Sequence, residues 1–306
     1  VGLWREPPDT PWRRDVAIGR NVQTGEAILV DVWSPPSSIT PSGLGLVFLH
    51  GSGWHYADKD FGTRHFFKHL AWQGHVIIDV AYSLAPAVDI LGMVGDVKRA
   101  IVWTKQHSEE LKVHKDQVVL MGGSAGGHLA LLAAFAADDP RFDPPGLAAS
   151  TSVSPAVSYY GPTDMWAQFD RFSELPALDG KRRLERTFMR YLEKRTGFQF
   201  IPIHSLLPSL LGGNPTEVAE LYEIASPSRH ASGSCPPTLL LQGSHDFSGA
   251  APQVIQVHKA LLKAGAISYL LELPGTEHGF DLYKPGWSPA AQAATYVTER
   301  FLASIL

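Results

Sequence analysis

The sequence of 306 residues contains a single cysteine, Cys235. It therefore forms no intrachain disulfide and offers no cysteine-rich metal site. No apolar run approaches the roughly 20 residues that a membrane-spanning helix needs. Basic clusters are scarce too, since the net charge is -4 and the densest group, Lys181-Arg182-Arg183, is typical of a solvated helix face. These absences argue against a disulfide scaffold, a membrane-spanning protein and a nucleic-acid partner.

Signatures of bound cofactors and metals are missing as well. No Gly-x-Gly-x-x-Gly opens a helix after the first parallel strand, so a dinucleotide is not indicated. No Gly-Lys-Ser or Gly-Lys-Thr loop offers a phosphate cradle. The 13 histidines include no i, i+4 pair with a glutamate, which argues against a zinc hydrolase. We therefore expect no cofactor and no metal.

Localisation and assembly stay open at this level. A chain without disulfides is compatible with either side of a membrane. It begins at Val1 rather than methionine, as it would after removal of a signal peptide or an anchor. We expect a soluble protein, either cytoplasmic or exported, and a homodimer is one option for its assembly.

Short apolar runs alternate with helix-length segments through most of the chain. This alternation predicts an α/β fold with a mostly parallel central sheet and helices on both faces. The predicted strands are Leu44–Leu49, His75–Ala81, Gln117–Met121, Ala156–Tyr160, Thr238–Gln242 and Ser268–Leu273. Helical spacing is clear at Val94–Leu111 and Pro252–Ala264. Ahead of them, Ala17–Trp33 alternates around Thr24-Gly25, which predicts an antiparallel hairpin.

Residues 163–226 interrupt this alternation. They contain no clear strand but show helical patterns at Lys181–Lys194 and Pro215–Ile224. We interpret them as an inserted helical cap over the edge of the sheet where open α/β folds bind ligands. The α/β core then comprises residues 1–162 and 227–306. The aromatic residues of the cap either form its own small core or line a substrate pocket; they are Trp166, Phe169, Phe172, Phe188, Tyr191, Phe198 and Phe200.

The stretch Gly122-Gly123-Ser124-Ala125-Gly126 carries the strongest chemical signal. It lies between the predicted strand Gln117–Met121 and an alanine-rich helical segment, His128–Ala137. A serine on such a strand-to-helix turn is held in a strained bend that projects its hydroxyl out of the fold. Glycines two residues before and after are needed where neighbouring backbone approaches too closely for side chains. Ser124 is therefore a candidate nucleophile.

A second glycine-rich loop, His50-Gly51-Ser52-Gly53-Trp54, follows the strand Leu44–Leu49. Small residues at a strand exit leave backbone N–H groups free to point outward, and such donors stabilise a tetrahedral oxyanion. A plain glycine turn beside a buried histidine is the alternative. The serine turn downstream favours the oxyanion role for Ser52 and Gly53, because acyl transfer needs both parts.

The nucleophile also needs a base and an orienting acid. His278 follows the strand Ser268–Leu273 in a polar, glycine-flanked loop, and Asp246 follows the strand Thr238–Gln242. Both would reach the same sheet edge as Ser124, in the chain order serine, acid, histidine. His50 and His245 precede the acid and do not fit this order. We expect His128 to face away from the serine hydroxyl, and Glu277 to lie at the surface or behind the base.

With these parts in place, the chain resembles the α/β-hydrolase superfamily, in particular its hormone-sensitive-lipase-like and bacterial feruloyl or acetyl esterase-like branch. The resemblance runs from about Ala27 to the C-terminus and departs from the family pattern where Ser52 replaces a glycine and Ser83 an arginine. Besides the two glycine-rich loops, its motifs are Asp79-Val80-Ala81-Tyr82-Ser83-Leu84-Ala85-Pro86, Gly95-Asp96-Val97-Lys98, Tyr159-Tyr160-Gly161-Pro162-Thr163-Asp164 and Glu277-His278-Gly279-Phe280.

The resemblance implies a serine esterase. Ser124 would attack an ester carbonyl, His278 would take its proton, and Asp246 would orient the imidazole. The N–H group of Ala125 would join those of Ser52 and Gly53 in the oxyanion hole. We expect Trp54 and Phe280, which neighbour these parts, to contact the substrate.

The expected substrates are short- to medium-chain or aromatic esters. Two alternatives stay open. One is an amidase, formamidase or peptidase that uses the same triad. The other is a non-enzymatic ligand receptor on this fold, although such receptors lose the catalytic histidine.

Overall fold

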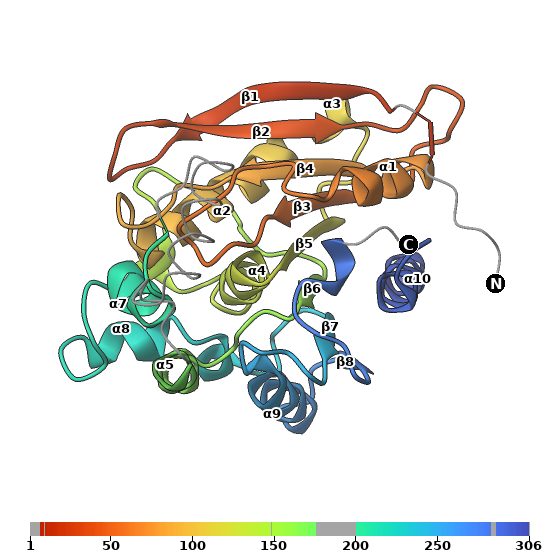
Figure 1. Ribbon diagram of the computed structural model, residues 1–306. Coiled ribbons are helices and arrows are strands. Elements are labelled where there is room, and N and C mark those ends of the chain that lie inside the picture. Colours follow the sequence, from red (N-terminus) through yellow and green to blue (C-terminus); the bar gives the residue numbers. More distant parts are fainter. Residues whose placement is uncertain (1–6, 9, 148, 176–199, 283–285, 306) are drawn as a thin grey trace.

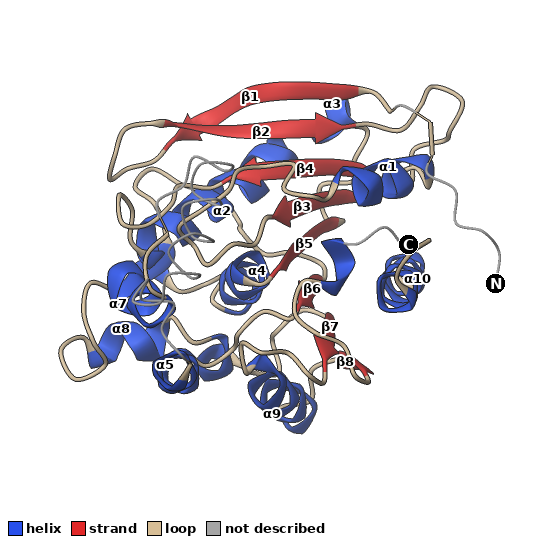
Figure 2. Ribbon diagram, in the orientation of Figure 1, coloured by secondary structure: helices blue, strands red, loops and turns tan. Residues whose placement is uncertain are grey.

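The computed structural model describes residues 7–8, 10–147, 149–175, 200–282 and 286–305. Its centre is an eight-stranded sheet in the order β1-β2-β4-β3-β5-β6-β7-β8 (Figures 1 and 2). The strands are β1 (Trp12–Arg20), β2 (Ala27–Trp33), β3 (Gly45–Leu49), β4 (Val76–Ala81), β5 (Val118–Gly123), β6 (Ala156–Tyr159), β7 (Thr238–Gly243) and β8 (Ser268–Leu273). Only the β1–β2 and β2–β4 pairs are antiparallel. The predicted α/β class and mostly parallel sheet are confirmed.

Alternating side chains of the strands bury two separate cores, one on each face of the sheet. Along β3, Val47 and Leu49 point into one core, whereas Leu46 and Phe48 point into the other. Both faces of this strand are apolar because helices cover both sides of a parallel sheet. Helices α2, α4 and α9 cover the first face, and α1 and α10 cover the second. The described helices are α1 (Arg64–Trp72), α2 (Ile90–Gln106), α3 (Ser108–Leu111), α4 (Ala125–Phe135), α5 (Met165–Glu174), α7 (Leu206–Leu211), α8 (Ala219–Ile224), α9 (Ala250–Lys263) and α10 (Pro289–Ala303).

Helix boundaries differ from the sequence prediction where capping decides them. The helix predicted over Val94–Leu111 begins earlier, because the Asp89 side chain accepts a hydrogen bond from the Gly92 N–H and caps α2. It is interrupted at His107. The short α3 that follows ends before Lys112, whose backbone is left-handed with φ 56°. None of the helices in the described part of the chain is long and apolar enough to cross a membrane.

Within residues 163–226 the structure describes three α-helices, α5, α7 and α8, which gather at one end of the sheet (Figure 1). The helix predicted at Pro215–Ile224 is shorter, since its first residues form a turn and α8 begins at Ala219. The helix predicted at Lys181–Lys194 lies outside the described residues.

The register of the parallel strands brings distant loops together at one edge of the sheet. Leu49 of β3 lies opposite Gly122 of β5, and Gly243 of β7 lies opposite Leu273 of β8. The loops that follow β3, β5, β7 and β8 therefore leave the sheet side by side. All the candidate catalytic residues lie in or beside these loops.

Candidate active site

Ser124 lies in a strained turn between β5 and α4, with φ 54° and ψ -121°. Its backbone N–H donates to the carbonyl of Tyr159 at 2.9 Å, which fixes the turn against β6. The flanking glycines have no room for a side chain. A Cβ on Gly126 would lie 2.0 Å from the carbonyl oxygen of Leu49, and one on Gly122 would lie 2.6 Å from the same atom. Ser124 stands at the N-terminus of α4 but its hydroxyl does not cap the helix, so it is available to another partner.

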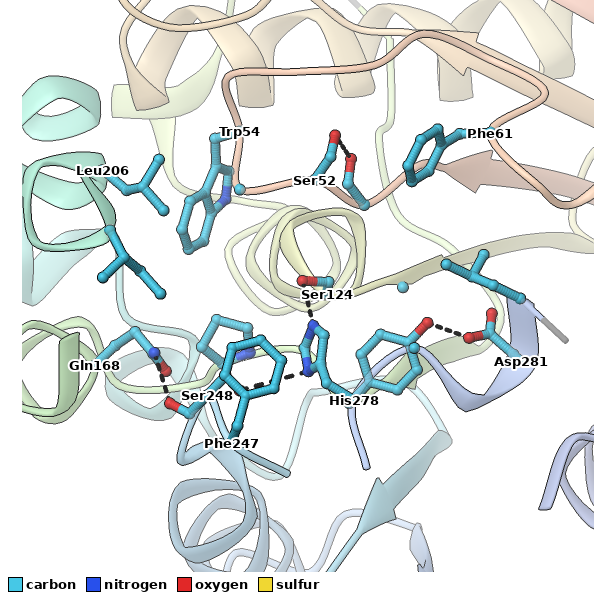
Figure 3. A pocket seen from close by; sticks show the side chains of 18 of the residues that line it. Ser52, Trp54, Phe61, Ser124, Gln168, Leu206, Phe247, Ser248, His278 and Asp281 are labelled. Atoms are coloured by element: carbon cyan, nitrogen blue, oxygen red, sulfur yellow. Dashed lines mark hydrogen bonds between the residues drawn. The ribbon is translucent and has the colours of Figure 1, made fainter. Parts of the chain in front are cut away.

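That partner is His278. Its Nε2 lies 2.8 Å from the hydroxyl oxygen of Ser124 (Figure 3). Its Nδ1 lies 2.8 Å from a carboxyl oxygen of Asp246. A carboxylate can only accept, so Nδ1 carries the hydrogen and Nε2 presents a lone pair to the serine hydroxyl. The three predicted residues thus form a continuous hydrogen-bonded chain, although they come from three different loops.

The carboxyl of Asp246 is buried among donors. One oxygen accepts from the backbone N–H of Ser248 at 2.8 Å and from its hydroxyl at 2.6 Å, and the other accepts from the amide of Gln242 at 3.0 Å. Burial alone would raise the pKa of Asp246, but the hydrogen bonds from His278, Ser248 and Gln242 more than offset it and lower this pKa. The acid is therefore held as a carboxylate.

Sequence reasoning did not single out Ser248 and Gln242. A serine two residues after an aspartate is a common turn signal, and a glutamine that ends an apolar strand is an unexpected polar residue. These signals indicate a local hydrogen bond but not its target.

The loop after β3 has an unusual backbone. Ser52, Gly53 and Trp54 all have positive φ, at 90°, 65° and 63°. Only glycine adopts this region freely, so Ser52 and Trp54 need support from their surroundings. The Ser52 hydroxyl forms short contacts with the carbonyl oxygens of Gly51 and Tyr56, which tie the loop to itself. Ser52 and Gly53 line the cavity that contains Ser124.

Ala125, the third predicted oxyanion residue, is the first residue of α4. N–H groups in the first turn of a helix have no acceptor within the helix. The backbone N–H of Ala125 directly follows the strained turn at Ser124.

Trp54 is anchored by a buried histidine. Its indole N–H donates to Nδ1 of His128 at 3.1 Å, and Nε2 of His128 lies 2.8 Å from the carbonyl oxygen of Ala225. This pairing defines a neutral ring with its hydrogen on Nε2. His128 thus joins the loop after β3 to the end of α8, and its ring bonds these two groups rather than the hydroxyl of Ser124.

This arrangement predicts a pH-dependent contribution to stability. Burial lowers the pKa of His128 from 6.5 to about 4. The folded protein therefore favours the neutral ring, and protonation would also place two donors face to face at Trp54. The contribution of the neutral His128 ring to the free energy of unfolding is fully present above pH 6.5. It is on the order of 3 kcal/mol and is lost as the pH falls from 6.5 toward about 4.

Urea unfolding of the wild type and of His128→Asn between pH 7 and pH 4 measures this contribution. We expect the free energy of unfolding to fall more steeply for the wild type, because the variant lacks the titrating ring. Parallel curves for the two proteins would contradict this assignment.

The cavity that contains Ser124 has a volume of about 310 Å³. One wall comes from α5 and α7 and the residues beside them: Gln168, Phe172, Ile203 and Leu206. The opposite end is formed by Phe61, Asp281 and Leu282 (Figure 3). Of the two residues expected to contact substrate, Trp54 lines the cavity, whereas Phe280 is not among its lining residues. Phe280 is 3% exposed and packs on Tyr159 and Tyr160, because the short turn that contains it aims Asp281 toward the cavity instead.

The aromatic side chains described within residues 163–200 lie in different surroundings. Trp166 and Phe169 pack on Tyr222, within the insert, whereas Phe172 lines the cavity. Phe200 packs on Tyr56 of the core. The remaining three, Phe188, Tyr191 and Phe198, lie outside the described residues.

The other candidate groups lie away from the reacting atoms. His50 is buried and stacks on Tyr82, and burial lowers the pKa of His50 to about 4. His245 is exposed. Glu277 is exposed as well, and its carboxylate accepts from the backbone N–H of Phe247 at 3.3 Å. The described residues contain no group of three or more His, Cys, Asp or Glu side chains that could hold a metal ion.

The chain is similar to curated mycobacterial esterases and matches the sequence model of a protein family. The sequence model of the BD-FAE family matches residues 30–261. The probable carboxylic ester hydrolase LipM of Mycobacterium tuberculosis is 31% identical over all of this chain. The esterases LipQ and LipC of the same organism are each 29% identical, over 84% and 91% of the chain. The chain spans 68%, 55% and 65% of the lengths of LipM, LipQ and LipC, respectively.

The fold is also similar to that of a solved bacterial esterase. Esterase Est2 of Thermogutta terrifontis, in its propionate-bound form, has a TM-score of 0.71 and 22% identity, over 99% of this chain and 97% of that one. The same enzyme phosphonylated by sarin has a TM-score of 0.73, over 99% of this chain and 98% of that one. At this level of identity the similarity establishes the shared fold.

Proposed function

The chain belongs to the BD-FAE family and is a serine carboxylic ester hydrolase, and from this premise we propose that Ser124, His278 and Asp246 are its catalytic residues. The observation that supports this most directly is the unbroken chain from Asp246 through His278 to Ser124, with both contacts at 2.8 Å. It ends in a cavity large enough for a small ester. What the whole protein acts on and which partners it has are likewise proposals.

In the first half of the reaction, the hydroxyl of Ser124 attacks the ester carbonyl while Nε2 of His278 accepts its proton. Asp246 holds the imidazole in the tautomer that can accept and stabilises the imidazolium that forms. The N–H groups of Ala125, Ser52 and Gly53 receive the oxyanion. His278 then returns the proton to the leaving alcohol, and an acyl group stays on Ser124.

In the second half, water takes the place of the alcohol. His278 accepts a proton from the water as it attacks the acyl carbonyl, and the same N–H groups receive the second oxyanion. Collapse of this intermediate returns the proton to Ser124 and releases the carboxylic acid. Because the oxyanion donors act only in the two transition states, they accelerate both steps.

We propose that residues 163–226 act as a cap that shapes the substrate pocket. The contacts of the described part support this role, since Gln168 and Phe172 of α5 and Leu206 of α7 line the cavity. The cap is also tied to the core, because His128 bonds the carbonyl of Ala225 and Gln253 of α9 bonds Gln168 at 2.9 Å.

The proposed substrates are esters with short- to medium-chain or aromatic acyl groups. The cavity of about 310 Å³ supports this choice, because its lining is largely aromatic and aliphatic and its size limits the acyl chain. Amide hydrolysis is the second candidate. Its only support is that a serine, histidine and aspartate triad can also cleave amides. Homodimer formation and the absence of a nucleic-acid partner stay predictions from the sequence.

A chain-length series of 4-nitrophenyl esters tests the substrate class. We expect kcat/KM to be highest between acetate and octanoate and to fall by about tenfold or more for palmitate, because added methylenes would lie outside the cavity. The matching 4-nitroanilides should react more slowly than the esters. A flat response up to palmitate would contradict the size limit, and faster anilide cleavage would favour the amidase.

A further inference from the structure

Asp281 is the only acidic side chain among the described residues that line the cavity of Ser124. It lies in a short turn, Phe280–Leu282, just after His278. Figure 3 shows it at the opposite end of the cavity from Leu206 and Gln168, with Ser124 between them. A carboxyl group is unexpected in a lining that otherwise consists mostly of aromatic and aliphatic side chains.

The neighbours of Asp281 donate hydrogen bonds but supply no full positive charge. The hydroxyl of Tyr160 donates to its carboxyl, and no lysine or arginine in the described ranges forms an ion pair with it. Burial raises the pKa of Asp281, although the hydrogen bond from Tyr160 partly offsets this. A cation that entered the cavity would therefore find an uncompensated carboxyl group, and its binding would favour the ionised form.

Asp281 has no place in the proton transfers described above. Nδ1 of His278 already has its carboxylate partner in Asp246. Tyr160 stands between Asp281 and the base, since its ring packs on His278 with centroids 4.4 Å apart while its hydroxyl reaches Asp281. No catalytic residue therefore occupies this carboxyl, and besides the bond from Tyr160 it can interact with a group on the substrate.

Aromatic rings accompany this carboxyl. Phe61 lines the same end of the cavity and is 41% exposed, and the ring of Tyr160 lines it too. The loops of Phe61 and Asp281 face each other, because a Cβ on Gly62 would lie 3.5 Å from the side chain of Leu282. Aromatic faces attract cations, and a carboxylate beside them supplies the opposite charge.

We propose that Phe61, Tyr160 and Asp281 form a subsite for a positively charged ammonium group on the ester substrate. The inference rests on the proposed function, since the ester itself must reach Ser124. The charged group would then lie several bonds away from the scissile carbonyl, on either the acyl or the alcohol part. Asp281 would thus determine specificity rather than take part in the chemistry.

Two pairs of esters of matched shape test the subsite and show which part of the substrate it binds. For the alcohol part, 2-(dimethylamino)ethyl butanoate is compared with 3-methylbutyl butanoate. For the acyl part, methyl 4-(dimethylamino)butanoate is compared with methyl 5-methylhexanoate. Rates are measured in a pH-stat at a pH where the amines are protonated. We expect Asp281→Asn to lower the ratio of kcat/KM for the charged ester to that for its neutral partner by about tenfold or more in one pair.

Asp58→Asn is the matched control. It removes the same unit of charge from an exposed residue three positions before Phe61 that does not line the cavity. We expect it to leave both ratios unchanged. Equal losses for charged and neutral esters in Asp281→Asn would overturn the subsite and would instead indicate that Asp281 positions Tyr160 against His278.

A measurement on the wild type alone tests the subsite even if the Asp281→Asn variant does not fold. Tetramethylammonium chloride should inhibit hydrolysis of 3-methylbutyl butanoate competitively, whereas sodium chloride at equal ionic strength should not. Equal effects of the two salts would overturn the subsite while leaving the esterase proposal intact. If the wild type hydrolyses none of the four esters and no 4-nitrophenyl ester, the proposed function itself has failed.

Discussion

Replacement of Ser124 by alanine is expected to reduce ester hydrolysis to the background rate, a loss in kcat on the order of 10⁶. The hydroxyl oxygen of Ser124 is the atom that His278 can deprotonate, at 2.8 Å from Nε2. Alanine removes this atom but leaves the cavity, His278 and the backbone donors in place. Any residual rate would then come from binding and the oxyanion donors alone. Initial rates with 4-nitrophenyl butanoate measure the loss.

Covalent labelling separates loss of the nucleophile from loss of the fold. A fluorophosphonate probe should label the wild type stoichiometrically and Ser124→Ala not at all. Ser173→Ala is a suitable control, because the hydroxyl of Ser173 is exposed on α5 and bonds only the carbonyl of Phe169 in the described structure. It should be labelled and active like the wild type. Near-normal turnover by a correctly folded Ser124→Ala would show that another group attacks the ester.

The parts of this protein that were predictable from sequence are those fixed by local chemistry. The glycines around Ser124 predict a turn that is too tight for side chains. In the structure Gly126 packs against the carbonyl of Leu49, which leaves no room for a Cβ. The alternation of apolar runs and helical segments likewise determines a parallel sheet, because only helices on both faces can bury such strands.

The parts that were missed depend on contacts between distant segments. Phe280 and Asp281 are neighbours, and nothing local says which of them faces the cavity. Contacts with Tyr160, which precedes Phe280 by 120 positions in the sequence, determine which side chain faces the cavity. The ring of Tyr160 packs on Phe280, and its hydroxyl donates a hydrogen bond to Asp281. The surroundings of Asp246 combine both kinds of contact, since Ser248 and Gln242 lie within four positions of it, whereas His278 reaches it from a different loop.

Conversion of Asp246 to asparagine is expected to lower kcat by about 10⁴ while the protein stays folded. Four donors converge on this carboxyl: the Nδ1–H of His278, the N–H and the hydroxyl of Ser248, and the amide of Gln242. Asparagine replaces one acceptor oxygen by an NH₂ group. If that group faces His278, Nδ1 must accept and Nε2 then carries the hydrogen, so the ring can no longer take a proton from Ser124. If it faces Ser248, two donors meet in a buried site.

Ser248→Ala is the matched control for this prediction. It removes one neutral donor but keeps the carboxylate and therefore the tautomer of His278, so kcat should fall by about tenfold at most. Thermal unfolding followed by circular dichroism establishes that both variants are folded, and the pH dependence of kcat reports the ionisation of the base in each. A loss of less than about tenfold in Asp246→Asn would mean that the carboxylate does not set the tautomer. The hydrogen bond between His278 and Ser124 would then have to be maintained by the loop of His278 itself.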